Sequence, residues 1–113
     1  MPMPAFTKDI LAEFSDDTLT LMEEGSAPVV IPYREHPEIF GHPRFLMADF
    51  DNSAALVRKT LANLRGARFA LIAPRIIVNI NRQLNGGIME IDKSIIQQIF
   101  TEAGARKVEI RNA

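Results

Sequence analysis

The chain has 113 residues, of which 47% are hydrophobic and 24% are charged, with a formal net charge of −1 and no cysteine. This length suits one domain, and the composition is that of a globular protein with its own core. The lack of cysteine excludes disulfides and thiolate metal sites and is compatible with the cytoplasm. No apolar run approaches the roughly 20 residues that cross a bilayer, and the N-terminus lacks the features of a secretory signal. We therefore expect one soluble, cytoplasmic domain over residues 1–113.

The charges are distributed unevenly along the chain. Residues 1–51 carry ten acidic and three basic side chains, residues 52–89 carry six basic and no acidic ones, and residues 90–113 carry four of each. Such separation can steer an acidic partner or orient two copies of the chain against each other. The candidate partner-binding residues are therefore basic residues of the middle segment: Arg58, Lys59, Arg65, Arg68 and Arg75. The alternative is that the fold scatters these charges over a solvated surface.

The N-terminal residues 6–14 carry apolar side chains at helical spacing, so residues 1–15 are a candidate amphipathic helix. A first β-strand is the alternative. Membrane attachment is not expected, because this segment has one lysine against two acidic residues. Residues 18–22 and 27–31 then flank a turn that ends in Gly25, and they predict an antiparallel hairpin.

The middle of the chain predicts a loop followed by a helix. Residues 33–44 are rich in proline and predict a loop, and residues 45–50 predict an extended piece. A helix begins after Asn52 or Ser53 as its cap and ends near Gly66. The apolar face of this helix consists of Leu56, Val57, Thr60, Leu61 and Leu64.

The C-terminal part predicts a strand, a helix and a strand. The β-branched run of residues 75–80 is typical of a strand buried on both faces, and residues 81–87 predict a loop. Gly104 can end the next helix, and residues 107–110 alternate as a strand does. A strand–helix–strand order favours parallel pairing, so we expect an α/β domain with a mixed sheet, in which a hairpin is followed by helix, strand, helix and strand. The apolar face of the last helix consists of Ile88, Ile91, Ile95, Ile96, Ile99, Phe100 and Ala103.

Three segments, in this order, resemble the bacterial actin-like rod-shape-determining family (MreB). They look like the family's first hairpin, its extended stretch with the helix after it, and the strand, helix and strand that follow. The resemblance implies an RNase H-like half of an actin fold, the first of its two lobes, in a bacterial protein concerned with cell shape. The segments are "DTLTLMEEG" (17–25), "FLMADFDNSAALVRKTL" (45–61), and "APRIIVNI" (73–80) with "MEIDKSIIQQIFTEAGARKVEI" (89–110).

The family that the chain resembles hydrolyses ATP in a cleft between two lobes. Its first phosphate loop is an aspartate-x-glycine-threonine turn, whereas residues 13–17 ("EFSDD") lack glycine and place two carboxylates where an anion would lie. The chain also ends at Ala113, before the second lobe would begin. The family's water-positioning glutamate corresponds to Asp92, although a carboxylate there equally stabilises a helix N-terminus, and we favour that role. We therefore expect no enzymatic activity and no cofactor.

Other candidate sites have weaker patterns. Gly86 and Gly87 precede a helix and could present backbone N–H groups to a phosphate, but they match neither glycine-rich nucleotide motif, and turn geometry explains them equally. His36 and His42 lack the ligand spacing of a metal site. The basic segment contains a single aromatic residue, Phe69, so we do not expect nucleic acid as a partner.

We expect a non-catalytic half-domain that acts through protein–protein contact. A lobe without its mate would expose apolar surface and a sheet edge, which favours a homodimer or the regulation of full-length actin-like filaments. One alternative is a nucleotide- or phosphate-binding protein whose cleft is completed by oligomerisation. Another is an α/β domain whose likeness to actin is limited to the fold.

Overall fold

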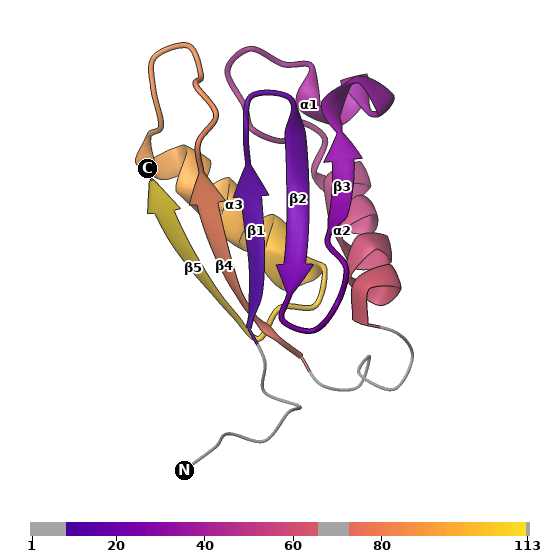
Figure 1. The fold of residues 1–113 in the computed structure, drawn as a ribbon. Helices are drawn as coiled ribbons and strands as arrows, with labels where there is room; N and C mark the ends of the chain where they lie inside the picture. Colours follow the sequence, from indigo (N-terminus) through magenta and orange to yellow (C-terminus); the bar gives the residue numbers. More distant parts are fainter. Residues whose placement is uncertain (1–8, 66–72, 113) are drawn as a thin grey trace.

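A computed structural model describes residues 9–65 and 73–112 of the chain. The strands form one five-stranded sheet in the order β3-β2-β1-β4-β5 (Figure 1). The predicted α/β domain with a mixed sheet is therefore confirmed. The elements in chain order are β1 (Ile10–Phe14), β2 (Thr18–Glu23), β3 (Val29–Pro32), a short 3-10 helix (Tyr33–Glu35), α1 (Pro37–Phe40), α2 (Phe50–Arg65), β4 (Arg75–Ile80), α3 (Glu90–Glu102) and β5 (Lys107–Asn112).

β1 lies at the centre of the sheet and joins its two halves. It pairs antiparallel with β2 and parallel with β4, so that Ala12 lies opposite Leu21 on one side and Val78 on the other. β2 pairs antiparallel with β3, and β4 pairs parallel with β5. The predicted hairpin and the predicted parallel pairing of the last two strands are both confirmed.

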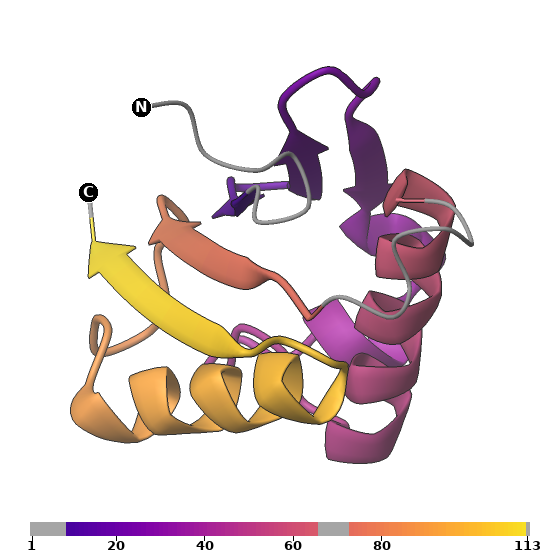
Figure 2. The ribbon, with the colours of Figure 1, turned by 90° about the horizontal axis from the view of Figure 1, so that it is seen from below.

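The hydrophobic core lies on one face of the sheet. Side chains alternate between the two faces of a strand. On the core side of β1, Ile10, Ala12 and Phe14 are all 0% exposed. Figure 2 shows α2 and α3 on that same side, where the ring edge of Phe14 meets Phe100 with centroids 6.4 Å apart. The result is two layers, a sheet and a pair of helices.

The prediction of a strand buried on both faces at residues 75–80 was wrong. β4 alternates between buried and half-buried residues, with Ile76, Val78 and Ile80 in the core. Ile77 points to the opposite face, which no helix of the described residues covers. The apolar run in residues 75–80 is therefore uninterrupted because Ile77 on the open face is apolar, and not because a second core covers that face.

Of the two alternatives for the N-terminal segment, the amphipathic helix was wrong and the first strand is confirmed in the part that the structure describes, because Ile10–Phe14 form β1. Ile10 and Phe14 are four residues apart, which places them on one face of a helix. Four is also an even number, so the same two residues share one face of a strand. Residues 1–8 lie outside the described part of the chain, as does the predicted helix end at Gly66.

The connection between β3 and α2 is more ordered than its proline content predicted. The expected loop contains α1, with Ile39 and Phe40 buried. The extended piece predicted at residues 45–50 is not a strand, because Phe50 already begins α2 and the residues before it form a loop. Leu46 and Met47 are nevertheless buried, so this loop contributes to the core.

The apolar face of α3 differs from the predicted one by one residue in its first turn. Ile91 is 60% exposed, whereas Asp92 is 2% exposed. Adjacent helical residues point about 100° apart. The buried stripe accordingly continues from Asp92 through Ile96 and Ile99. A carboxylate therefore occupies the buried position at the start of this helix, which the apolar pattern had assigned to isoleucine.

Replacing Phe100 by alanine tests the one-sided core. Phe100 is a fully buried ring. We expect Phe100→Ala to lower the free energy of unfolding by about 3–5 kcal/mol, because it removes this ring and leaves a cavity. Urea denaturation followed by circular dichroism measures the change.

The matched control is Gln97→Ala, at an exposed position on the same helix. Its expected change is within about 0.5 kcal/mol, as is usual for surface substitutions. Equal effects of the two substitutions would contradict the assigned core.

Candidate functional site

The carboxyl ends of β1 and β4 are where a ligand would be expected, because ligands of open α/β sheets bind at the carboxyl ends of the strands. The turn after β1 is closed by the Ser15 N–H, which donates to the Thr18 carbonyl at 2.9 Å. Asp16 and Asp17 are exposed at its tip. Every positive-φ residue in the described part of the chain is a glycine, so this turn lacks the left-handed residue of an anion-binding nest. A phosphate at this turn would meet two carboxylates.

Polar groups beside this turn are bonded to one another. The Tyr33 hydroxyl donates to the Ser15 carbonyl at 2.6 Å, and its burial raises the pKa of Tyr33 above the ordinary value. The Arg82 guanidinium lies 4.5 Å from the centre of the Tyr33 ring and donates to the carbonyl of Phe40 at 2.7 Å. Arg82 therefore holds α1 against the sheet.

Asp92 lies at the start of α3 and is held from two sides. Its two carboxylate oxygens accept hydrogen bonds from the Arg44 guanidinium at 3.1 and 3.0 Å. The Met89 N–H donates to the same carboxylate at 2.7 Å. A residue at the third position of a helix accepts such a bond in a capping box. The side chain of Asp92 is 1% exposed, so its carboxylate oxygens face protein groups and not solvent. This geometry agrees with the stabilising role favoured for Asp92.

Gly86 and Gly87 lie in a turn before α3. The Gly87 N–H donates to the Leu84 carbonyl at 3.0 Å, and Gly86 has a φ of 85°. This geometry matches the third position of a type II turn. Gly87 also has a positive φ, of 76°. Both glycines are needed for backbone geometry, and the helix N-terminus behind them already binds the carboxylate of Asp92, with which a bound phosphate would have to compete.

The histidines show no metal-binding arrangement. His36 lies 3.8 Å from Glu38, while His42 accepts the N–H of Arg44 through its Nδ1 atom at 3.1 Å. Within residues 9–65 and 73–112, no group of three or more histidine, aspartate or glutamate side chains could hold a metal ion.

The predicted partner-binding arginines do not form one patch. Arg58 is exposed on α2 and donates to the Glu102 carbonyl at the end of α3, at 2.8 Å. Lys59 is exposed beside it. Arg65 is buried at the end of α2, with its Nε atom 3.3 Å from Glu23 of β2. Arg75 lies on β4, and Arg68 lies outside the described residues. The fold thus distributes this set between the helices and the sheet.

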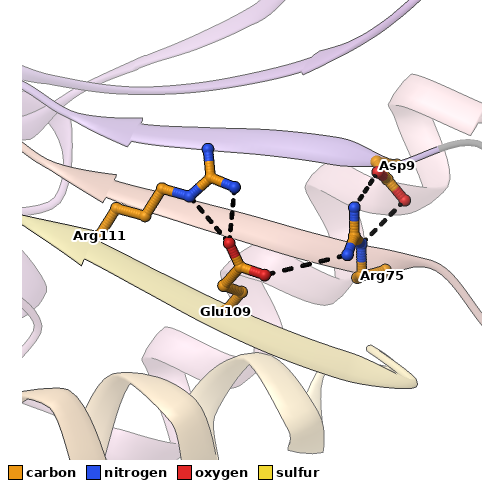
Figure 3. A network of polar contacts seen from close by, with 4 residues as sticks. All are labelled: Asp9, Arg75, Glu109 and Arg111. Carbon is orange, nitrogen blue, oxygen red and sulfur yellow. Dashed lines mark hydrogen bonds and ion pairs between the residues drawn. The ribbon is translucent and has the colours of Figure 1, made fainter.

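The open face of the sheet carries an ion-pair network that joins β4, β5 and Asp9, the residue directly before β1 (Figure 3). Arg75 of β4 donates to both carboxylate oxygens of Asp9, at 3.2 and 2.6 Å, and approaches Glu109 of β5 to 3.9 Å. Glu109 also pairs with Arg111 at 2.6 Å. Three half-buried apolar residues lie on the same face: Leu11, Met22 and Ile77. This surface therefore combines half-buried apolar side chains with paired charges.

The two edges of the sheet differ. β3 has four residues, ends in Pro32 and follows Pro28. Proline cannot donate a hydrogen bond to an added strand. β5 has six residues without proline, and among the described strands only β4 pairs with it. We define the candidate interaction surface as the open face of the sheet together with the free edge of β5.

Sequence patterns missed Arg44 and Arg82, because their partners lie 48 and 42 residues away in the chain. Sequence patterns also did not identify Glu109 and Arg111 as part of the candidate interaction surface. A signal for these two was present, since charged residues at every second position of a strand share one face.

No known protein-family model matches the sequence, and no curated protein matches it. In the part of the chain that the structure describes, no helix has the length and apolar character needed to cross a membrane.

Removing the carboxylate of Asp92 should destabilise the fold. We expect Asp92→Ala to lower the free energy of unfolding by about 2–4 kcal/mol, because it removes a helix cap and leaves Arg44 without its partner. The control is Glu90→Ala on the same helical turn, where the glutamate side chain is 92% exposed. For this control a change within about 0.5 kcal/mol is expected. Chemical denaturation of both variants, and of Asp92→Ala combined with Arg44→Ala, measures the coupling. If the changes in the free energy of unfolding for Asp92→Ala and Arg44→Ala are simply additive in the double variant, the ion pair between these two residues is contradicted.

The pKa of Asp9 tests the network on the open face. The hydrogen bond from Arg75, supported by the charge of that guanidinium, holds the pKa of Asp9 below its ordinary value of 3.8. Because the folded-state pKa is the lower one, the stabilisation is present above pH 3.8 and is lost as the pH falls through the folded-state value. Carboxyl-carbon NMR titration should show the pKa of Asp9 rising towards 3.8 in Arg75→Gln.

The matched control for this titration is Arg111→Gln, which removes a guanidinium that pairs with Glu109 and not with Asp9. It should leave the titration of Asp9 close to that of the unsubstituted protein. An Asp9 titration that is the same with and without the Arg75 guanidinium would refute the assigned cause.

Proposed function

We propose that this protein is a non-catalytic, actin-like domain that works by binding another protein chain through the candidate interaction surface. The observation that carries the proposal is the one-sided core. Both long helices lie on one face, which leaves partly exposed apolar residues and paired charges on the other face. At the end of the sheet, the outer edge of β5 has no partner among the described strands. Unpaired strand edges and apolar patches are surfaces that proteins use for association.

The actin-like part of the proposal is supported by the arrangement of the sheet. An antiparallel hairpin in the first half of the chain and parallel strands with helices in the second half are compatible with the RNase H-like lobe that the resemblance implies. The resemblance also motivates a bacterial, cytoplasmic setting and a partner among actin-like filament proteins. Self-association is the simplest form of partner binding, since most soluble oligomers are symmetric homo-oligomers.

The non-catalytic part of the proposal is supported by the polar groups at the carboxyl ends of the strands, because most of them are bonded to other groups of the protein. Asp92 is bonded to Arg44 and to the backbone, Arg82 is bonded to carbonyl groups, and the turn after β1 presents carboxylates. A nucleotide at this end of the sheet would need donors that these contacts already use. The same groups weigh against a phosphate site completed by a second copy.

Two measurements test the proposed function. Isothermal titration calorimetry with ATP and Mg²⁺ should give no saturable binding in the submillimolar range, because the site would place phosphates against Asp16 and Asp17. Sedimentation velocity at micromolar concentration, of the chain alone and with filaments of an actin-like protein, should detect an assembly. Submillimolar ATP binding, or the absence of both self-association and co-sedimentation, would overturn the proposal.

A further inference from the structure

We propose that the partner of β5 is β5 of a second copy, which pairs with it antiparallel about a two-fold axis and continues the sheet from one copy into the other. This inference rests on the proposed function and specifies its partner, its strand and its register. It follows from three properties of β5: its free edge, its half-buried apolar residues and the order of its charges.

The free edge of β5 is suited to strand addition. An edge strand presents unpaired backbone donors and acceptors, and natural proteins protect such edges with proline, bulges, short strands or charged side chains. β3 at the other edge has proline and is short, whereas β5 has neither of these two protections over its six residues. β5 does carry charged side chains, so only a partner strand whose charges are complementary to them can pair with it. Val108 and Ile110 are only half-buried although they pack against the core, so a neighbouring strand would cover them further.

Symmetry restricts the possible registers. A two-fold axis that relates antiparallel strands of one continuous sheet is perpendicular to that sheet, so both copies carry their helices on the same side. Residues opposite each other then belong to the same face of their own copies. Within β5 this condition allows registers centred on Val108, Glu109, Ile110 or Arg111. The register centred on Arg111 would place this arginine against its own equivalent, and like charges directly opposite are destabilising.

The charges select among these registers. Lys107, Glu109 and Arg111 lie on the open face. A register centred on Glu109 would place Glu109 against itself and Lys107 against Arg111, and like charges directly opposite are destabilising. A register centred on Ile110 places Glu109 opposite Arg111 of the second copy, twice by symmetry. Opposite charges in this position stabilise a pair of strands.

The register centred on Val108 is less complete. It would place Lys107 opposite Glu109, but it would also require Arg106, which precedes β5, to face Ile110. In the register centred on Ile110, all the residues from Val108 to Asn112 pair inside β5. Ile110 of each copy then meets its own equivalent on the helix side of the sheet, where apolar contact is favourable. We therefore assign the register centred on Ile110.

The charged side chains are accessible for this contact. Arg111 is 59% exposed and Glu109 is 36% exposed in their pair on the open face. Arg111 can therefore approach Glu109 of the second copy. An interface of one strand edge is smaller than the roughly 1,200 Å² of total buried area that stable complexes bury, so we expect a weak dimer with a dissociation constant in the micromolar range.

Charge reversal at the two positions tests the register. Glu109→Arg places like charges opposite each other at both symmetric contacts, and Arg111→Glu does the same with the opposite sign. Each variant alone should dimerise about tenfold more weakly or worse. An equimolar mixture of the two variants should restore dimerisation, because every contact in the mixed dimer joins opposite charges. Sedimentation equilibrium measures the dissociation constants, and native mass spectrometry identifies the mixed dimer.

The control is Lys59→Glu, a charge reversal on the exposed surface of α2 that should leave the dissociation constant unchanged. Circular dichroism of each variant verifies that it folds. A dimer whose stability is indifferent to all these substitutions would overturn the β5 interface and leave the proposed function standing. A chain that remains monomeric but co-sediments with actin-like filaments would have the same consequence. Submillimolar ATP binding by a monomer would overturn both proposals.

Discussion

The structure depends on the central position of β1, which directs Ile10, Ala12 and Phe14 to one face of the sheet. β1 pairs with β2, which follows it in the sequence, and with β4, which comes only after β2, β3 and α2. The burial of apolar area stabilises a fold by about 25 cal/mol per Å². Most of the fully buried side chains lie on this face or on the helices that cover it. Both long helices must therefore pack there, and the opposite face is left to charged and half-buried residues.

Arginine side chains connect the helices, and the loop before α2, to the rest of the domain. Arg44 connects the loop before α2 to α3, Arg82 connects α1 to the end of β4, and Arg65 connects α2 to β2. A guanidinium binds carboxylates and carbonyls in a fixed planar geometry, so it suits such connections. The basic segment of the sequence is thus used in part inside the molecule, which reduces its contribution to any electrostatic field around it.

This division of roles has a consequence for function. The carboxyl ends of the strands are where α/β proteins commonly hold ligands. In this protein Arg82, Tyr33 and Asp92 are engaged there with the protein itself. On the open face the charges of β5 are partly or fully exposed and alternate in sign, and no described strand pairs with the outer edge of β5. This contrast is the reason why we propose that the domain binds a strand or a surface of another chain and not a small charged ligand.

The sequence by itself determined the features that depend on local periodicity. The hairpin, the β-branched strand before residue 81, the two long helices and the last strand were predicted close to their observed places, because each element buries residues at its own repeat. The local pattern was ambiguous at Ile10 and Phe14, whose spacing of four fits one face of a helix and one face of a strand. It was misleading at Ile91, because the buried neighbour is Asp92.

Only the tertiary structure decided which face of the sheet is covered and which charges meet. Ile77 continues an apolar run, yet it lies on the open face because both helices pack on the other side. Asp92 is buried because Arg44, 48 residues away, arrives to bind it, and Arg75 is fixed by Asp9, 66 residues away. The partner of a charge depends on the path of the folded chain through space, which no local pattern contains.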